Sequence, residues 1–140
     1  MTHPRVHLVE WLRDAHAMEQ HSEQMLRGQA KRLERYPKLA QGLQRHLEQT
    51  LAQQELLEQC LERMDASPSA LKDLAGRLGA GAQALATMAV EDEPVKATMA
   101  CLAFEQMEVA TYTVLFAAAN QAGDIQCQRM FDRLLQEEQA

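Results

Sequence analysis

The sequence has few of the residues that build β-sheets. Aromatic residues make up 4% of the 140-residue chain, and only 13 residues are β-branched. Gly (6) and Pro (4) are also scarce, whereas Ala, Leu, Gln and Glu together supply half of the chain. These four are strong helix formers, and sheets depend on the residue types that are missing here. The composition therefore predicts an all-α fold, and the length fits a single domain over residues 1–140.

Positive charge and long apolar runs are also lacking. The formal net charge is −6, and no run of Lys or Arg reaches three residues, so we expect no nucleic-acid surface. The first 20 residues have no apolar core of the signal-peptide type. The most apolar segment, residues 97–123, is interrupted by two Glu and by several amides and Thr, which disfavours a membrane span. We therefore expect a cytoplasmic protein with no membrane partner.

Cysteines are few and odd in number. Cys60, Cys101 and Cys127 lie far apart and lack the spacing of a disulfide framework or a zinc site. We expect a reducing compartment, with all three side chains filling the core as small apolar residues.

Proline and glycine divide the chain into helices. The predicted helices cover about 5–34, 38–65, 69–89, 94–121 and 125–139. Pro37 and Pro94 suit the first turns of helices, Gly123 suits a helix C-cap, and Asp124 can cap the helix that follows. The first two helices predict an antiparallel hairpin and the last two predict another. The chain should therefore form a four-helix bundle with an additional crossover helix.

Polar residues interrupt the apolar seams of these helices. The stretch "QRHLEQTLAQQ", residues 44–54, places amides, a Thr and His46 on a seam that should be buried. Residues 97–123 are apolar nearly all round, which predicts a helix buried inside the bundle, yet they carry Glu105 and Glu108 one turn apart. Burying a carboxylate costs several kcal/mol unless a proton, a cationic side chain or a metal ion compensates for the lost hydration.

Acids and a histidine on other helices can share this environment. Glu19 follows the apolar seam of the first helix, and Glu138 lies one turn after Leu134 in the last helix. Inward Glu side chains from several helices, with a nearby His, form the general pattern of a carboxylate-bridged di-iron or di-manganese site. The alternative is a metal-free network in which the acids are partly protonated and hydrogen-bonded to Gln49, Gln53 and Tyr112.

The chain resembles the YciE/YciF-like ferritin-like proteins, and YciE most closely. The likeness is carried by "WLRDAHAMEQ" at 11–20, "HLEQT" at 46–50, "FEQMEVATYTVLFAAANQAGD" at 104–124 and "LLQEEQ" at 134–139. It implies a ferritin-like four-helix bundle, usually a homodimer, in a bacterial cytoplasmic protein linked to stress responses. It also implies a di-iron site of the rubrerythrin kind and relatives that continue past Ala140. Carried over by position, the implied metal ligands are Glu19, His46, Glu105, Glu108 and Glu138.

The second helix departs from the family pattern. Relatives commonly read H-L-x-E-T, whereas this sequence has Gln49 at the position of the acid. Counting from the turn at Tyr36 leaves Glu19 and His46 roughly 10 Å apart along straight helices, and it puts Gln53 level with Glu19. An amide is a weaker ligand for a hard cation than a carboxylate, so the departure weakens the expected site.

Two functions follow from the sequence. The first is a metalloprotein with iron or manganese as its cofactor, which handles iron, O₂ or peroxide as a ferroxidase-type or peroxidase-type oxidoreductase. The second is a non-enzymatic helical stress or scaffold protein with a degenerate metal site.

Overall fold

The computed structural model describes residues 3–64, 66 and 93–139, and this part of the chain is all-helical. Its helices are α1 (Pro4–Arg32), α2 (Pro37–Arg63), α4 (Glu93–Ala122) and α5 (Ile125–Gln139). They agree with four of the predicted helices to within a few residues. The predicted crossover helix, residues 69–89, lies outside the described residues.

The helix ends follow the predicted punctuation. Pro37 is the first residue of α2, and Pro94 lies in the first turn of α4. Gly123 ends α4 with a φ of 73°, a left-handed conformation that favours glycine. The next residue caps α5, because the Asp124 carboxylate accepts a hydrogen bond of 3.0 Å from the backbone N–H of Cys127. The α4–α5 connection is therefore tight, and the two helices turn back on each other.

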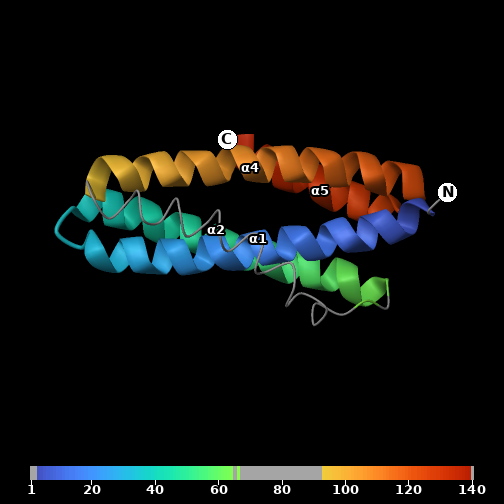
Figure 1. The fold of residues 1–140 in the computed structure, drawn as a ribbon, viewed down its shortest axis with the longest axis horizontal. Helices are drawn as coiled ribbons and strands as arrows, with labels where there is room; N and C mark the ends of the chain where they lie inside the picture. The colour runs from blue at the N-terminus through green and yellow to red at the C-terminus, as the bar shows by residue number, and fades with distance from the viewer. Residues whose placement is uncertain (1–2, 65, 67–92, 140) are drawn as a thin grey trace.

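The helices form a four-helix bundle of two antiparallel hairpins (Figure 1). The helices α1 and α2 pack along each other, as do α4 and α5, and α1 also packs on α4. Contact between α2 and α5 is sparse. The last helix has 15 residues, against 27 to 30 in the others, and it ends near the middle of α4 (Figure 1). The end of α5 therefore lies near the centre of the bundle.

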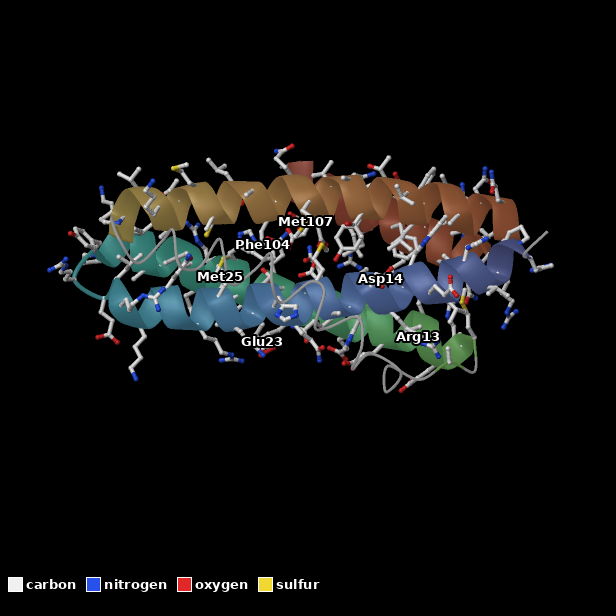
Figure 2. All side chains as sticks on the ribbon, in the orientation of Figure 1. Arg13, Asp14, Glu23, Met25, Phe104 and Met107 are labelled. Carbon is white, nitrogen blue, oxygen red and sulfur yellow. The ribbon has the colours of Figure 1, made fainter. Side chains whose placement is uncertain are left out.

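The core consists of two apolar clusters. One joins all four helices and contains Leu12, Leu57, Tyr112 and Phe131. The other joins α1, α2 and α4 near the α1–α2 turn, where Phe104 faces Met25 and its neighbours (Figure 2). Fully or nearly fully buried polar side chains lie between the clusters in chain order: Glu19, Ser22, Thr50, Gln53 and Glu108. We call this set, together with Gln49 and Glu138, the polar layer.

One expectation about α4 is wrong. Its apolar sequence predicted burial on all sides, but five large apolar side chains are 37 to 57% exposed: Val95, Met99, Leu102, Met107 and Val114. The physical reason is the arrangement of the bundle, since α4 packs along α1 and α5 and its outward side has no neighbour within the described residues. Along the described helices, none combines the length and hydropathy that crossing a membrane requires.

The four-helix cluster should dominate stability. Leu57 is fully buried in it, so we expect Leu57→Ala to lower the free energy of unfolding by about 2–5 kcal/mol. Leu51→Ala is the matched control, because this leucine lies on the same helix and is 38% exposed; its change should stay within about 0.5 kcal/mol. Urea unfolding followed by circular dichroism measures both, and equal losses would contradict this assignment of the core.

Candidate functional site

Three acids from three helices meet in the polar layer. Glu19 of α1 and Glu108 of α4 are fully buried, and Glu138 near the end of α5 is half-buried. Glu108 and Glu138 both affect the pKa of Glu19, and Glu19 and Glu138 both affect the pKa of Glu108. The three carboxyl groups therefore lie close together. Glu138 reaches the level of Glu108 because both residues lie 15 positions from Gly123 at the α4–α5 turn.

Neutral donors surround the acids. The Tyr112 hydroxyl donates a 2.5 Å hydrogen bond to Glu19 Oε1. From α2, the amide of Gln53 donates to Glu138 Oε1 at 2.5 Å, and that of Gln49 reaches the same oxygen at 3.3 Å. Gln49, which stands where the family pattern has an acid, and Gln53, which lies level with Glu19, therefore both donate to Glu138 and link α2 to α5.

Three carboxyl oxygens in this layer accept no hydrogen bond from the described residues while the acids are ionised. They are Glu19 Oε2 and both oxygens of Glu108, all of them buried. A proton on Glu108 would let it donate to Glu19 or Glu138, both of which lie within hydrogen-bonding reach. The hydroxyls of Ser22 and Thr50 are also buried and unpartnered. Buried polar atoms are normally satisfied, and a cluster of exceptions needs an explanation such as a proton, a water molecule or an ion. The layer therefore contains buried acceptor atoms that a proton, a water molecule or a cation could satisfy.

Burial controls the protonation of these acids. Loss of hydration raises the pKa of Glu19 to about 8, although the hydrogen bond from Tyr112 opposes the rise. Burial raises the pKa of Glu108 to about 12, and the negative charges of Glu19 and Glu138 add to the effect. The pKa of Tyr112 is also raised by burial and by Glu19, so this phenol remains a donor. Without another cation, Glu108 is protonated at neutral pH.

The other two predicted ligands form a separate pair. His46 Nδ1 lies 3.4 Å from Glu105 Oε1, and both side chains are partly exposed. They line a groove of about 230 Å³ between α2 and α4, together with Lys38 and Leu102. The separation of His46 from the level of Glu19 follows the count from the α1–α2 turn. Among the described residues, no group of three or more His, Cys, Asp or Glu side chains has an arrangement that could hold a metal ion.

The register of α1 and α2 agrees with the count from Tyr36. The amide of Gln54, next to Gln53, donates to the backbone carbonyl of Glu19 at 3.3 Å and to Glu23 Oε1 at 3.1 Å. His16, three residues before Glu19, is buried and lies 2.8 Å from Glu58 Oε1. Sequence reasoning did not find this His16–Glu58 pair, although the same register count places Glu58 within two residues of the level of His16.

Comparisons with known proteins agree with this architecture. The chain is similar to protein XCC3681 from Xanthomonas campestris pv. campestris, whose crystal structure superposes with a TM-score of 0.78 at 32% sequence identity. The match covers 96% of this chain and 82% of that one. Residues 3–140 match the family described as "Domain of unknown function (DUF892)". The fold and the family match together show that the chain belongs to the DUF892 family.

Proposed function

We propose that this protein is a ferritin-like metal-binding protein in which Glu19, Glu108 and Glu138 hold iron or manganese after their side chains turn toward a shared ion. As they stand, the described residues include no group already arranged as metal ligands. The observation that carries the proposal is the set of three buried, unpartnered carboxyl oxygens on Glu19 and Glu108. Carboxylate oxygens are ligands that suit divalent iron and manganese.

The chain's own residues would prepare this site. Tyr112 orients Glu19, and Gln53 and Gln49 orient Glu138, through the hydrogen bonds already present. Glu108 would release its proton when a cation enters, so binding should be coupled to proton release. The two apolar clusters on either side keep bulk water from the acids. Bound iron or manganese would supply redox chemistry toward O₂ or peroxide, as expected of a cytoplasmic, stress-associated protein.

His46 and Glu105 enter this proposal as a second position. They are already paired at 3.4 Å, and a second ion would take its nitrogen donor from His46. Because the pair is partly exposed and separate from the three acids, we expect it to bind more weakly.

Metal binding is tested by anaerobic loading with Fe²⁺, followed by dialysis and elemental analysis. We expect wild-type protein to retain at least one equivalent, Glu108→Gln to lose it, and His46→Ala to keep it. Glu137→Gln is the matched control, because Glu137 neighbours Glu138 but is exposed and paired with Arg133 at 3.2 Å. No stoichiometric iron or manganese in the wild-type protein would overturn the proposal.

A second candidate function is a non-enzymatic helical stress or scaffold protein. It is favoured by the donors that already reach Glu138 from Gln49 and Gln53, and by a proton on Glu108 in place of a metal. In this case the polar layer is a structural network, and its charge is neutralised by protons alone.

This second function predicts how stability depends on pH. The folded pKa values of Glu19 and Glu108 are raised from the ordinary 4.5 to about 8 and about 12. The folded state therefore binds more protons, so stability is greatest below about pH 4.5 and falls as the pH rises through 8. In chelator-treated protein, Glu108→Gln should raise stability at pH 8 by on the order of 2 kcal/mol and flatten the decline.

The control for this experiment is Glu105→Gln, one turn away on α4 but about a third exposed. Urea unfolding at pH 5.5 and pH 8 should give it the wild-type slope. A Glu108→Gln variant as pH-dependent as the wild type would contradict a proton-neutralised layer. Strong loss of wild-type stability on adding chelator would instead favour the metal-binding function.

We also propose that the chain forms a homodimer through the outward face of α4. Between Val95 and Gln121, the charged residues of this helix are Lys96 and Glu105, which are partly exposed, and the buried Glu108. Its exposed side chains include Val95, Met99, Leu102 and Val114, each about half exposed. Extended apolar patches of this kind mark interaction surfaces, and a second copy would cover this face.

Light scattering after size-exclusion chromatography tests the dimer. We expect Leu102→Glu to shift the protein from dimer to monomer, because the new carboxylate would be buried at the interface. Leu51→Glu, on an exposed position of α2, should leave the dimer intact. A monomeric wild-type protein, or a dimer insensitive to Leu102→Glu, would contradict this interface.

A further inference from the structure

Two cysteines meet where α2 ends and α5 begins. Cys60 lies in the last turn of α2 and Cys127 in the first turn of α5, and their Sγ atoms are 2.7 Å apart. Both side chains are buried, and both thiols are free. They were expected to fill the core, and they do contact the four-helix cluster. Their juxtaposition adds a chemical possibility that core packing does not require.

A cation lies beside the two sulfurs. The Arg63 guanidinium approaches Cys127 Sγ at 3.0 Å and Cys60 Sγ at 3.2 Å. Arg63 also donates to the side-chain oxygen of Gln126 on α5, which holds its position across the helix junction. A neighbouring guanidinium favours the thiolate, which is the nucleophilic form of cysteine.

The two cysteines are not equivalent. The hydrogen bond from Cys127 lowers the pKa of Cys60 to about 7, and Arg63 adds to this effect. The pKa of Cys127 is raised, first because of its hydrogen bond to Cys60 and then by burial. Burial also raises the pKa of the third cysteine, Cys101, to about 11. Cys60 is therefore the thiol best suited to attack an electrophile.

Cys60 is only 1% exposed, but it borders a pocket at the end of α2. The pocket has a volume of about 610 Å³ and is lined by Cys60, Arg63, Gln126 and Met130, among others. This volume is ample for a small hydroperoxide, and Arg63 is placed to interact with its oxygens. The pocket, the Arg63 guanidinium and the two cysteine sulfurs therefore lie together, away from the polar layer.

We propose that Cys60 and Cys127 form a reversible disulfide between α2 and α5, made by a small hydroperoxide and broken by a thiol. Cys60 first gives its proton to solvent. The resulting thiolate attacks one peroxide oxygen, the O–O bond breaks, and the leaving oxygen takes up a proton from solvent to become water or an alcohol. The Cys127 sulfur then attacks the sulfenic sulfur of Cys60. The S–O bond breaks, and hydroxide leaves as water with the Cys127 proton.

The electrons balance in this sequence. The two sulfurs give up two electrons, which reduce one peroxide, and two external thiols later return the protein to its dithiol while forming their own disulfide. The two Sγ atoms need to close only from 2.7 Å to the roughly 2.0 Å of a disulfide. No metal takes part, so this inference is independent of the proposed function.

The test uses the full chain, reduced, freed of metal and treated with one equivalent of hydrogen peroxide. We expect the number of titratable thiols to fall from three to one, with a loss of two hydrogen atoms by mass and a Cys60–Cys127 peptide in a non-reducing digest. Dithiothreitol should restore all three thiols. Thermal unfolding should show a higher Tm for the oxidised form, because the bond joins helices that otherwise touch sparsely.

Matched variants separate this reaction from general oxidation. Cys101→Ala should still form the disulfide, and Cys127→Ser should stop at a Cys60 sulfenic acid that dimedone traps. Arg63→Gln should slow the reaction at pH 7 by about tenfold, since the thiolate fraction of Cys60 falls. Circular dichroism shows whether each variant retains its helices. Three titratable thiols after peroxide, preferential oxidation of Cys101, or disulfides only between chains would overturn the proposal.

Discussion

Burial of carboxyl groups between two apolar clusters is the constraint on which the rest of this bundle depends. Glu19 and Glu108 have no access to solvent, and their burial has to be compensated by protons, by hydrogen bonds or by a cation. This requirement accounts for the short hydrogen bond from Tyr112 and for the strongly raised pKa of Glu108. The same acids can bind protons or a metal ion. The free-energy difference between the protonated and the metal-bound state therefore determines which of the two proposed functions applies.

The amides of α2 are central to this choice. In the resembled family an acid is common on this helix, whereas here Gln49 and Gln53 donate to Glu138. A neutral donor in place of a carboxylate removes one negative charge from the site. It also donates a hydrogen bond to Glu138 Oε1, an oxygen that could otherwise bind a cation. The replacement therefore stabilises the metal-free state and reduces the charge available for two ions. Membership in the DUF892 family defines the fold without deciding between the two states.

Local signals in the sequence were sufficient for the helices and for the levels at which the candidate residues lie along the bundle. Proline and glycine positions predicted the helix ends, and counting from Tyr36 predicted that His46 and Glu19 lie on different levels. The exposed face of α4 could not be read from its composition, because an apolar helix at an interface has the same sequence pattern as one inside a core. The Cys60–Cys127 pair was also beyond prediction, since the two residues are 67 positions apart and only the packing of the start of α5 against the end of α2 brings them together.

The sparse packing between α2 and α5 has a consequence for the motions of the bundle. These two helices are held by side-chain contacts at two levels, Gln49 and Gln53 with Glu138 at one and Cys60 and Arg63 with Cys127 and Gln126 at the other. The α2–α5 boundary is therefore where we expect local opening of the bundle to occur most readily. Backbone amides of α5 should exchange with solvent deuterium sooner than those of α1, and the buried acids would exchange their protons with water through the same opening.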